Sequence, residues 1–182
     1  LECALQTQPN ICLVSEEVEA KEMSLDDVVT YIAKVVADRA ADGNNFGTVL
    51  IPEGLIEFIP AIKKLIAELN EVLTDPATGE SREFANAEEQ IDFVKSSIAK
   101  DNLAILESLP EDVARQLCLD RDPHGNVQVS LIETEKLLSR MVEKKLEAWK
   151  EEGKYNGNFS AQHHFFGYEG RCAAPSNYDA DY

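Results

Sequence analysis

The chain has 182 residues and a formal net charge of −17 at pH 7. This length suits one domain, or a large piece of a bigger protein, and it is ample for a buried core. Such acidity argues against a nucleic-acid-binding protein, because phosphate backbones are bound through clustered Lys and Arg side chains.

The sequence contains no targeting or membrane signal. No charged and then apolar leader opens it, and no apolar run approaches the roughly 18 residues that a membrane span needs. We therefore expect no membrane partner and a cytoplasmic location. The chain starts at Leu1 without a Met and stops at Tyr182 without a terminating pattern, so we expect a segment of a longer protein.

The four cysteines are scattered at Cys3, Cys12, Cys118 and Cys172. They form no C-x-x-C pair, and no His stands near them at metal-binding spacing. Neither a zinc site nor a disulfide framework is expected. We expect reduced thiols that are mostly buried.

The N-terminal part has the pattern of an α/β fold. Residues 11–14 predict a short buried strand. Ser24 has the pattern of a helix N-cap with acidic residues in the first turn, and Gly43 would end that helix. Residues 46–51 form an apolar run, as expected of a strand that is covered on both faces. The order strand, helix, strand predicts a parallel sheet.

The middle of the chain reads mainly as helix. Pro60 suits the first turn of a helix with an apolar stripe that ends near residue 73, and 74–79 has turn composition. Apolar periodicity then predicts helices over 87–98, from Pro110 onward, and over 136–150. The outer faces of these helices are highly charged, which solvation explains.

A polar loop over 120–126 leads into a short predicted strand at 127–129. Asp120, Asp122 and Gly125 occupy positions one, three and six of a calcium loop. Position twelve is Leu131, which cannot supply the bidentate carboxylate that calcium requires. The sequence therefore predicts no calcium site here.

Glu53 follows the second predicted strand directly. Ligands of open parallel sheets bind beyond the carboxyl ends of the strands, so Glu53 is a candidate binding residue. Its carboxylate would repel a phosphate group but could accept hydrogen bonds from sugar hydroxyls. An exposed surface turn is the alternative interpretation.

A second candidate site lies near the end of the chain, where Gly167 and Gly170 bracket Tyr168 and Glu169 and are followed by Arg171. Glycine lets a ligand approach the backbone closely, and the Arg guanidinium suits phosphate. Together with Glu53 this motif describes a pocket for a sugar phosphate. The alternative is a glycine-rich turn with a solvated arginine. In so acidic a chain, we expect the site to be composite.

An apolar, strand-like run precedes that motif and contains His163 and His164. Neighbouring residues on a strand point to opposite faces, so the two rings are poor joint metal ligands. One ring could reach a ligand while the other packs, and the sequence does not decide which. The chain contains no known glycine-rich nucleotide cradle.

Several stretches together resemble one known family. They are FGTVLIPEG at 46–54, LDRDPHGNVQVS at 119–130, SAQ at 160–162 and HFFGYEGRCAAPSN at 164–177, with LECALQ at 1–6. They closely resemble the long form of pyrophosphate-dependent 6-phosphofructokinase. The opening stretch resembles the sequence just after the Met-Gly-Arg substrate motif of that family, and the resemblance covers the chain nearly from end to end.

The resemblance implies the fold and its division along the chain. Residues 1–73 would be an α/β substrate-side segment, part of a Rossmann-like, phosphofructokinase-type parallel sheet. Residues 74–159 would be a large, mainly helical insertion, and 160–182 would return to the α/β domain as a strand and a glycine-rich loop. The whole would be rich in helix.

The resemblance also implies a substrate-binding role. In that family the corresponding residues contact fructose 6-phosphate, which makes the expected substrate-binding residues Glu53, Tyr168, Glu169, Gly170 and Arg171. Arg171 would hold the 6-phosphate, and Glu53 would bind a sugar hydroxyl. The reaction would transfer a phosphoryl group from pyrophosphate to the 1-hydroxyl, giving fructose 1,6-bisphosphate in glycolysis. The parent protein would be a homo-oligomer, expected to be a dimer.

Two motifs of the family are absent from these residues. They are the Gly-Gly-Asp-Asp motif that binds pyrophosphate and magnesium, and the Thr-Ile-Asp-Gly-Asp motif with the catalytic aspartate. We therefore expect no catalytic or metal-binding residue in this chain, Mg²⁺ bound elsewhere, and no activity of the segment alone.

Three alternatives stay open from the sequence. The parent protein could use ATP as its phosphoryl donor, because the donor motif lies outside these residues. It could be a non-catalytic, regulatory subunit of the same family. The chain could also be an acidic helical interaction domain, for which the loss of Arg171 would leave every activity unchanged.

Overall fold

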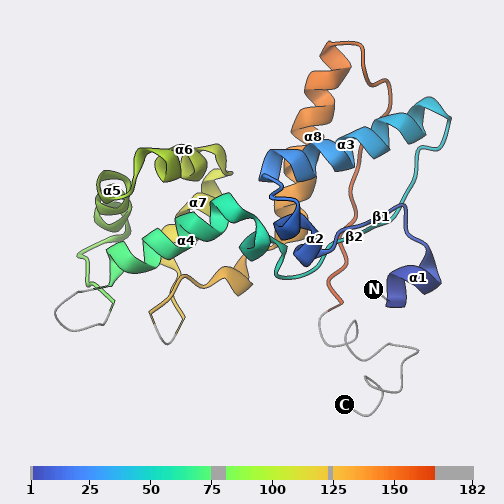
Figure 1. Ribbon diagram of the computed structural model, residues 1–182. Coiled ribbons are helices and arrows are strands. Elements are labelled where there is room, and N and C mark those ends of the chain that lie inside the picture. The colour runs from blue at the N-terminus through green and yellow to red at the C-terminus, as the bar shows by residue number, and fades with distance from the viewer. Residues whose placement is uncertain (1, 75–80, 123–124, 167–182) are drawn as a thin grey trace.

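The computed structural model describes residues 2–74, 81–122 and 125–166, which form a helix-rich structure with a small parallel sheet (Figure 1). The sheet consists of β1 (Ile11–Cys12) and β2 (Val49–Leu50). The α-helices in the described residues are α1 (Glu2–Thr7), α2 (Ser15–Ala20), α3 (Leu25–Ala41), α4 (Pro60–Leu73), α5 (Ala87–Ser97), α6 (Lys100–Ser108), α7 (Glu111–Leu119) and α8 (Thr134–Glu151). Two 3-10 helices are η1 (Leu55–Phe58) and η2 (Val129–Leu131). No helix in these ranges is both long and apolar enough to cross a membrane.

The predicted parallel pairing of the two strands is confirmed. Ile11 is opposite Val49, and Cys12 is opposite Leu50. Both strands are shorter than predicted. The first ends early because α2 begins at Ser15, and the second starts late because the Asn10 side chain, rather than a ladder partner, accepts the Thr48 backbone N–H at 2.9 Å.

The prediction that the second strand is covered on both faces is wrong for the described residues. Val49 and Leu50 are only half-buried, and Phe46 is 76% exposed. A sheet of two short strands offers each strand one neighbour and little packing surface, so it cannot enclose the run 46–51.

The helix that links the two strands begins and ends where the sequence predicts. Ser24 Oγ accepts the Asp27 backbone N–H at 3.1 Å, and the Asp27 carboxylate accepts the Ser24 backbone N–H at 2.9 Å, which completes a capping box. After Ala41 the chain turns at Gly43, whose φ of +81° is accessible to glycine at little cost. The side chains on the inner face of α3 are buried.

Helices α4 to α7 pack against one another, and we call them the helical cluster (Figure 1). Pro60 opens α4 as predicted, and the buried side chains of α4 recur at helical spacing: Ile62, Leu65, Leu69 and Leu73. The predicted helices at 87–98 and after Pro110 are confirmed as α5 and α7. Helix α6 is an addition to the predicted elements. The Glu68 carboxylate on α4 accepts the Ala99 backbone N–H at 2.9 Å, just before α6 begins.

The short strand predicted at 127–129 is wrong. Val127 makes an isolated antiparallel bridge with Arg121, and its backbone N–H is donated to Asn70 Oδ1 on α4 at 2.7 Å. Since that donor is used by a side chain, no ladder continues, and the chain turns into η2. The strand expected after residue 160 is also not formed over 160–166.

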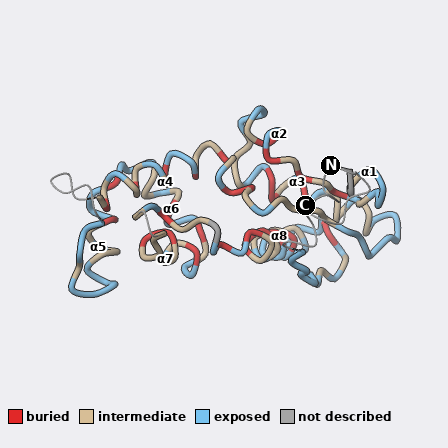
Figure 2. The backbone as a smooth tube through the Cα atoms, turned by 90° about the horizontal axis from the view of Figure 1, so that it is seen from below, coloured by how far each residue is buried: buried red, intermediate tan, exposed pale blue. Residues whose placement is uncertain are grey.

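Helix α8 confirms the last predicted helix and packs against α3, which it crosses (Figure 1). Lys145 on α8 contacts both Asp26 and Thr30 on α3, although 119 and 115 residues separate these pairs in the sequence. We call α3, α8 and the two strands the strand half. Buried segments occur both in the strand half and in the helical cluster (Figure 2). The division of the chain at residues 73 and 159 stays a prediction.

Candidate functional site

The candidate residue Glu53 lies three residues beyond the carboxyl end of β2 at Leu50 and two residues before η1 begins at Leu55. Residue Glu53 is exposed. Its backbone carbonyl accepts a long hydrogen bond, 3.4 Å, from Thr134 Oγ1 at the start of α8. Glu53 is thus at the strand end that the sequence pattern indicates, and its backbone is in contact with a helix from the far end of the chain.

The other candidate residues lie outside the described residues: Tyr168, Glu169, Gly170 and Arg171. Their expected contacts with the ligand stay predictions. The segment that leads to them is described as far as Phe166, and it turns back after α8 and runs beside that helix (Figure 1).

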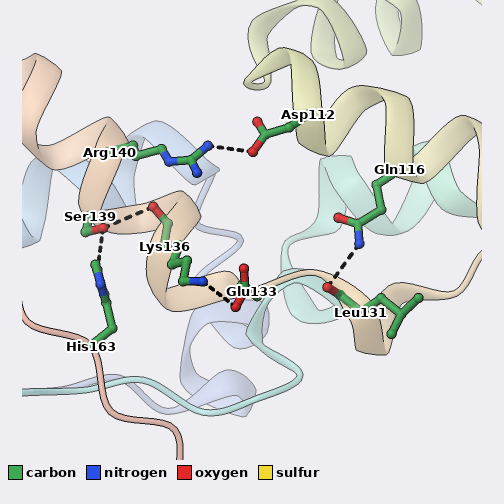
Figure 3. Close-up of polar contacts among 8 residues, drawn as sticks. All are labelled: Asp112, Gln116, Leu131, Glu133, Lys136, Ser139, Arg140 and His163. Carbon is green, nitrogen blue, oxygen red and sulfur yellow. Dashed lines mark hydrogen bonds and ion pairs between the residues drawn. The ribbon is translucent and has the colours of Figure 1, made fainter.

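His163 is held by α8. Its Nε2 atom lies 2.7 Å from Ser139 Oγ (Figure 3). The segment before it is also attached to α8, because Lys150 Nζ donates to the Gly157 carbonyl at 3.4 Å and lies 3.3 Å from Asn158 Oδ1. His164 is exposed and makes no hydrogen bond with another residue of the described ranges. The structure therefore shows which of the two rings contacts the helix.

A surface cavity of about 340 Å³ surrounds this contact. It is lined by Lys136, Ser139, Arg140, Glu143, Phe159, Ser160, Ala161 and His163. Its two cationic side chains are already engaged, since Lys136 pairs with Glu133 at 2.6 Å and Arg140 pairs with Asp112 on α7 (Figure 3). The hydrogen bond from Arg140 lowers the pKa of the Asp112 carboxyl below its ordinary value. This cavity is a polar contact region between α8 and the returning segment.

Sequence reasoning missed Ser139 and Thr134 as contacts of the candidate site. Thr134 is 4% exposed, at a position that a helical apolar pattern would give to a hydrophobic residue. A buried hydroxyl in that place needs a partner, which is the signal that could have drawn attention to it. Ser139 carries no such signal, because a half-buried serine on a helix is common.

The described residues contain no group of three His, Cys, Asp or Glu side chains that could hold a metal ion. Cys12 and Cys118 are free thiols, of which Cys118 is buried and Cys12 half-buried. Burial raises the pKa of the Cys118 thiol above its ordinary value, so this thiol stays protonated.

Comparison with known proteins gives a consistent result over the whole chain. No family model matches the sequence. The chain is 61% identical over 182 residues to pyrophosphate–fructose 6-phosphate 1-phosphotransferase of Porphyromonas gingivalis, covering 33% of that protein. It is 51% identical to the protein of the same name from Treponema pallidum, covering 32% of it. It is also 51% identical to the beta subunit of this enzyme from Solanum tuberosum, covering 30% of it.

Each of these alignments includes all 182 residues, and the chain spans about a third of the length of the curated relatives. The resemblance found in the sequence is therefore confirmed: the chain is homologous, over its whole length, to a segment of the pyrophosphate–fructose 6-phosphate 1-phosphotransferases.

Proposed function

We propose that this chain is the substrate-binding portion of a glycolytic phosphofructokinase that transfers a phosphoryl group from pyrophosphate to the 1-hydroxyl of fructose 6-phosphate. The product is fructose 1,6-bisphosphate. The observation that carries this proposal is the 61% identity over all 182 residues to a protein of that name. An identity of this extent over the whole chain does not depend on one short motif.

The local structure around Glu53 supports a binding role. The two strands are parallel, and Glu53 is exposed beyond the carboxyl end of β2, which is the usual place for ligands of parallel sheets. In this proposal β1 and β2 belong to a larger Rossmann-like sheet, whose other strands come from residues outside this chain.

Two ends of the sugar phosphate would be bound differently. Arg171 offers a planar, permanently charged fork that donates two hydrogen bonds to the 6-phosphate. The Glu53 carboxylate accepts a hydrogen bond from a sugar hydroxyl, which fixes the orientation of the ring. Tyr168, Glu169 and Gly170 are the other proposed contacts with fructose 6-phosphate.

The donor side of the reaction would come from outside these residues. The described ranges contain no group of three His, Cys, Asp or Glu side chains that could hold a metal ion. In the proposal, the parts of the longer protein beyond this chain provide the Mg²⁺ site, the pyrophosphate site and the catalytic aspartate. Bound Mg²⁺ would neutralise charge on the pyrophosphate.

The longer protein is proposed to be a cytoplasmic homo-oligomer, with a dimer as the expected state. A composite site in an oligomer would also explain how so acidic a chain holds an anionic sugar phosphate, because a second chain could contribute cations.

The substrate assignment is tested by Arg171→Ala in the full-length protein that carries this sequence. Loss of a charge-assisted contact costs about 1.5–3 kcal/mol, which corresponds to an increase of about 10- to 150-fold in KM for fructose 6-phosphate. KM for pyrophosphate should stay unchanged, since Arg171 is assigned to the acceptor side. Arg115→Ala, on the exposed face of α7, is the matched control. An unchanged KM for fructose 6-phosphate would contradict the assignment.

The phosphoryl donor is tested on the same protein with pyrophosphate and ATP as competing substrates. The proposal requires turnover with pyrophosphate. Turnover with ATP alone would assign the protein to the ATP-using enzymes. No turnover with either donor, together with retained binding of fructose 6-phosphate, would indicate a non-catalytic subunit.

A further inference from the structure

Asn10 binds both backbone groups of Thr48, at the point where β1 and β2 begin to pair. The Thr48 N–H donates to Asn10 Oδ1 at 2.9 Å, and the Thr48 carbonyl accepts the Asn10 N–H at 3.0 Å. The ladder that follows has two residues on each strand, and both residues of β2 are half-buried. Burial therefore distinguishes poorly between the two faces of β2, and so short a ladder specifies its register weakly. The contact with Asn10 selects one alignment of the strands.

Gly47 leaves room for this contact. A Cβ atom at position 47 would lie 2.9 Å from Asn10 Oδ1, which is closer than Cβ atoms come to other atoms in proteins. Another residue at this position would therefore push the Asn10 side chain away from the Thr48 N–H. The φ angle of Gly47 is not positive, so its backbone conformation alone does not require glycine. The close approach of Asn10 does.

Arg39, near the end of α3, holds the residue before Gly47. Its Nε and Nη2 atoms both donate to the Phe46 carbonyl, at 3.3 and 3.1 Å, and its guanidinium lies 5.7 Å from the centre of the Phe46 ring. Because this ring is 76% exposed, its attraction to the guanidinium, rather than burial, keeps it in place. The segment 46–48 is thus held both from the start of β1 and from α3.

We propose that Asn10, Gly47 and Arg39 fix the register of β2 and are positioning residues for Glu53. We call these three residues the register clamp. Since Glu53 lies three residues beyond β2, its place depends on the register of that strand. A slip by one residue would move the strand by about 3.3 Å and turn its side chains to the opposite face. This inference rests on the proposed function, because it assumes that Glu53 binds the sugar.

The connection between β2 and Glu53 is stiff enough to transmit such a shift. It consists of Ile51 and Pro52. Proline fixes its own φ angle and restricts the residue before it to extended conformations. A hydrogen bond from a sugar hydroxyl to the carboxylate forms over about 2.5–3.0 Å, so a shift of one residue would abolish it.

The contact on the other side of Glu53 is weaker. Thr134 Oγ1 reaches the Glu53 carbonyl at 3.4 Å, which is long for a hydrogen bond. Both bonds between Asn10 and Thr48 are shorter than this. We therefore expect the register clamp to contribute more to the position of Glu53 than Thr134 does.

The test uses Asn10→Ala, Gly47→Ala and Arg39→Ala in the full-length protein that carries this sequence. Each variant should raise KM for fructose 6-phosphate by about three- to tenfold, the range for one hydrogen bond. KM for pyrophosphate should stay unchanged, because the clamp positions a residue on the acceptor side. Amide hydrogen exchange over 46–50 should accelerate. Asn10→Asp keeps an acceptor oxygen near the same place and should restore both the KM and the protection.

Two double variants show whether the clamp acts as proposed. Asn10→Ala with Gly47→Ala should have the KM of Asn10→Ala alone, because the added Cβ then has no side-chain oxygen to displace. In a Glu53→Ala background the clamp variants should cause no further increase in KM, because a carboxylate that is absent cannot be misplaced. A merely structural role would give the same increase in both backgrounds.

The helical cluster provides matched controls for two members of the clamp. Asn70 Oδ1 on α4 accepts a backbone N–H at 2.7 Å, as Asn10 Oδ1 does. Arg82 Nε donates to a backbone carbonyl of α4 at 3.0 Å, and its guanidinium lies 5.4 Å from an aromatic ring of α5, which matches Arg39. Asn70→Ala and Arg82→Ala remove the same kinds of contact away from the two strands and should leave both KM values unchanged.

Several results would overturn the proposal. They are an unchanged KM in Asn10→Ala and Gly47→Ala, an equal increase in KM for both substrates, and an undiminished increase in the Glu53→Ala background. An unchanged KM in Glu53→Ala itself would also overturn it, because Glu53 would then bind no sugar hydroxyl. If Arg171→Ala raises KM for fructose 6-phosphate and the clamp variants do not, the register clamp fails while the proposed function stands.

Discussion

The helical cluster and the strand half are assembled in different ways. Contacts within the cluster join residues that are close in the sequence, as between Gln90 and the Cys118 carbonyl, 28 residues apart. Contacts within the strand half join the two ends of the chain, as between Lys145 and Asp26, 119 residues apart. The cluster is formed by one continuous stretch of chain, 60–119. The helix that packs on α3 is α8, which follows that stretch in the sequence.

This difference shows why the candidate site belongs to the strand half. Glu53 and His163 are brought near α8 from distant parts of the sequence, and only a long-range arrangement can combine them. The cluster, by contrast, holds its helices through apolar side chains on α4 and through capping contacts such as Glu68 with Ala99. We therefore expect damage to the cluster to affect stability first, and damage to the strand half to affect the site as well.

The largest expected loss of folding stability comes from replacing one buried leucine by alanine in each region. Leu69 on α4 is 0% exposed and Leu146 on α8 is 1% exposed. Leu69→Ala and Leu146→Ala should each lower the free energy of unfolding by about 2–5 kcal/mol, measured by denaturant titration. Amide hydrogen exchange should accelerate mainly in α4 to α7 for the first variant and mainly in α3 and α8 for the second.

The control for both leucine variants is Leu5→Ala, because Leu5 is 76% exposed. It should change the free energy of unfolding by no more than about 0.5 kcal/mol. If either core variant accelerated exchange equally in all helices, the two regions would unfold as one cooperative unit. That result would contradict the distinction between the helical cluster and the strand half.

A smaller effect is expected at the start of α3. Ser24→Ala removes the N-cap and should cost about 1 kcal/mol of folding free energy, whereas Ser24→Thr should keep most of it. The hydrogen bonds from Ser24 lower the pKa of the Asp27 carboxyl below its ordinary value of 3.8. This stabilisation is present above the ordinary pKa and is lost as the pH falls through the lowered one.

The Ser24 prediction therefore includes a pH dependence. The difference in free energy of unfolding between the wild type and Ser24→Ala should be full at neutral pH and should shrink below about pH 4, where Asp27 becomes protonated. A difference that stays constant down to pH 2 would show that the cap does not act through the carboxylate.

The smallest effect is expected where the two regions meet. Arg140 on α8 and Asp112 on α7 form an ion pair, but both side chains are more than half exposed (Figure 3). Water and salt screen such a pair, so a double-mutant cycle with Arg140→Ala and Asp112→Ala should give a coupling energy near zero at physiological salt. A clear coupling that survives high salt would show that this pair joins the regions, which would weaken the distinction between them.

The sequence predicts local structure well where the signal is short-ranged. Ser24, Gly43 and Pro60 mark helix ends because capping and backbone geometry depend on the next few residues alone. The prediction fails at Val127, because its backbone donor is taken by Asn70, 57 residues away. The strand over 46–51 is also shortened, since its length depends on the neighbours that a sheet offers.

At the candidate site, too, sequence-based prediction succeeds for local features and fails for contacts between distant residues. Glu53 could be placed from sequence alone, because the end of a strand is a local feature. The contacts of Thr134 and Ser139 could not, because a hydroxyl on a helix has no pattern that names a partner 81 or 24 residues away. The sequence also left open which histidine contacts α8, and only the path of the returning segment settles that it is His163.

The sequence by itself determined helices α3, α4, α5, α7 and α8, the parallel order of the strands and the resemblance to one family, because each depends on residue type and spacing along the chain. Only the tertiary structure decided that α8 covers α3 and contacts both segments of the candidate site. Packing of distant elements depends on how well whole surfaces fit together, and that information is spread over many side chains rather than held in one motif.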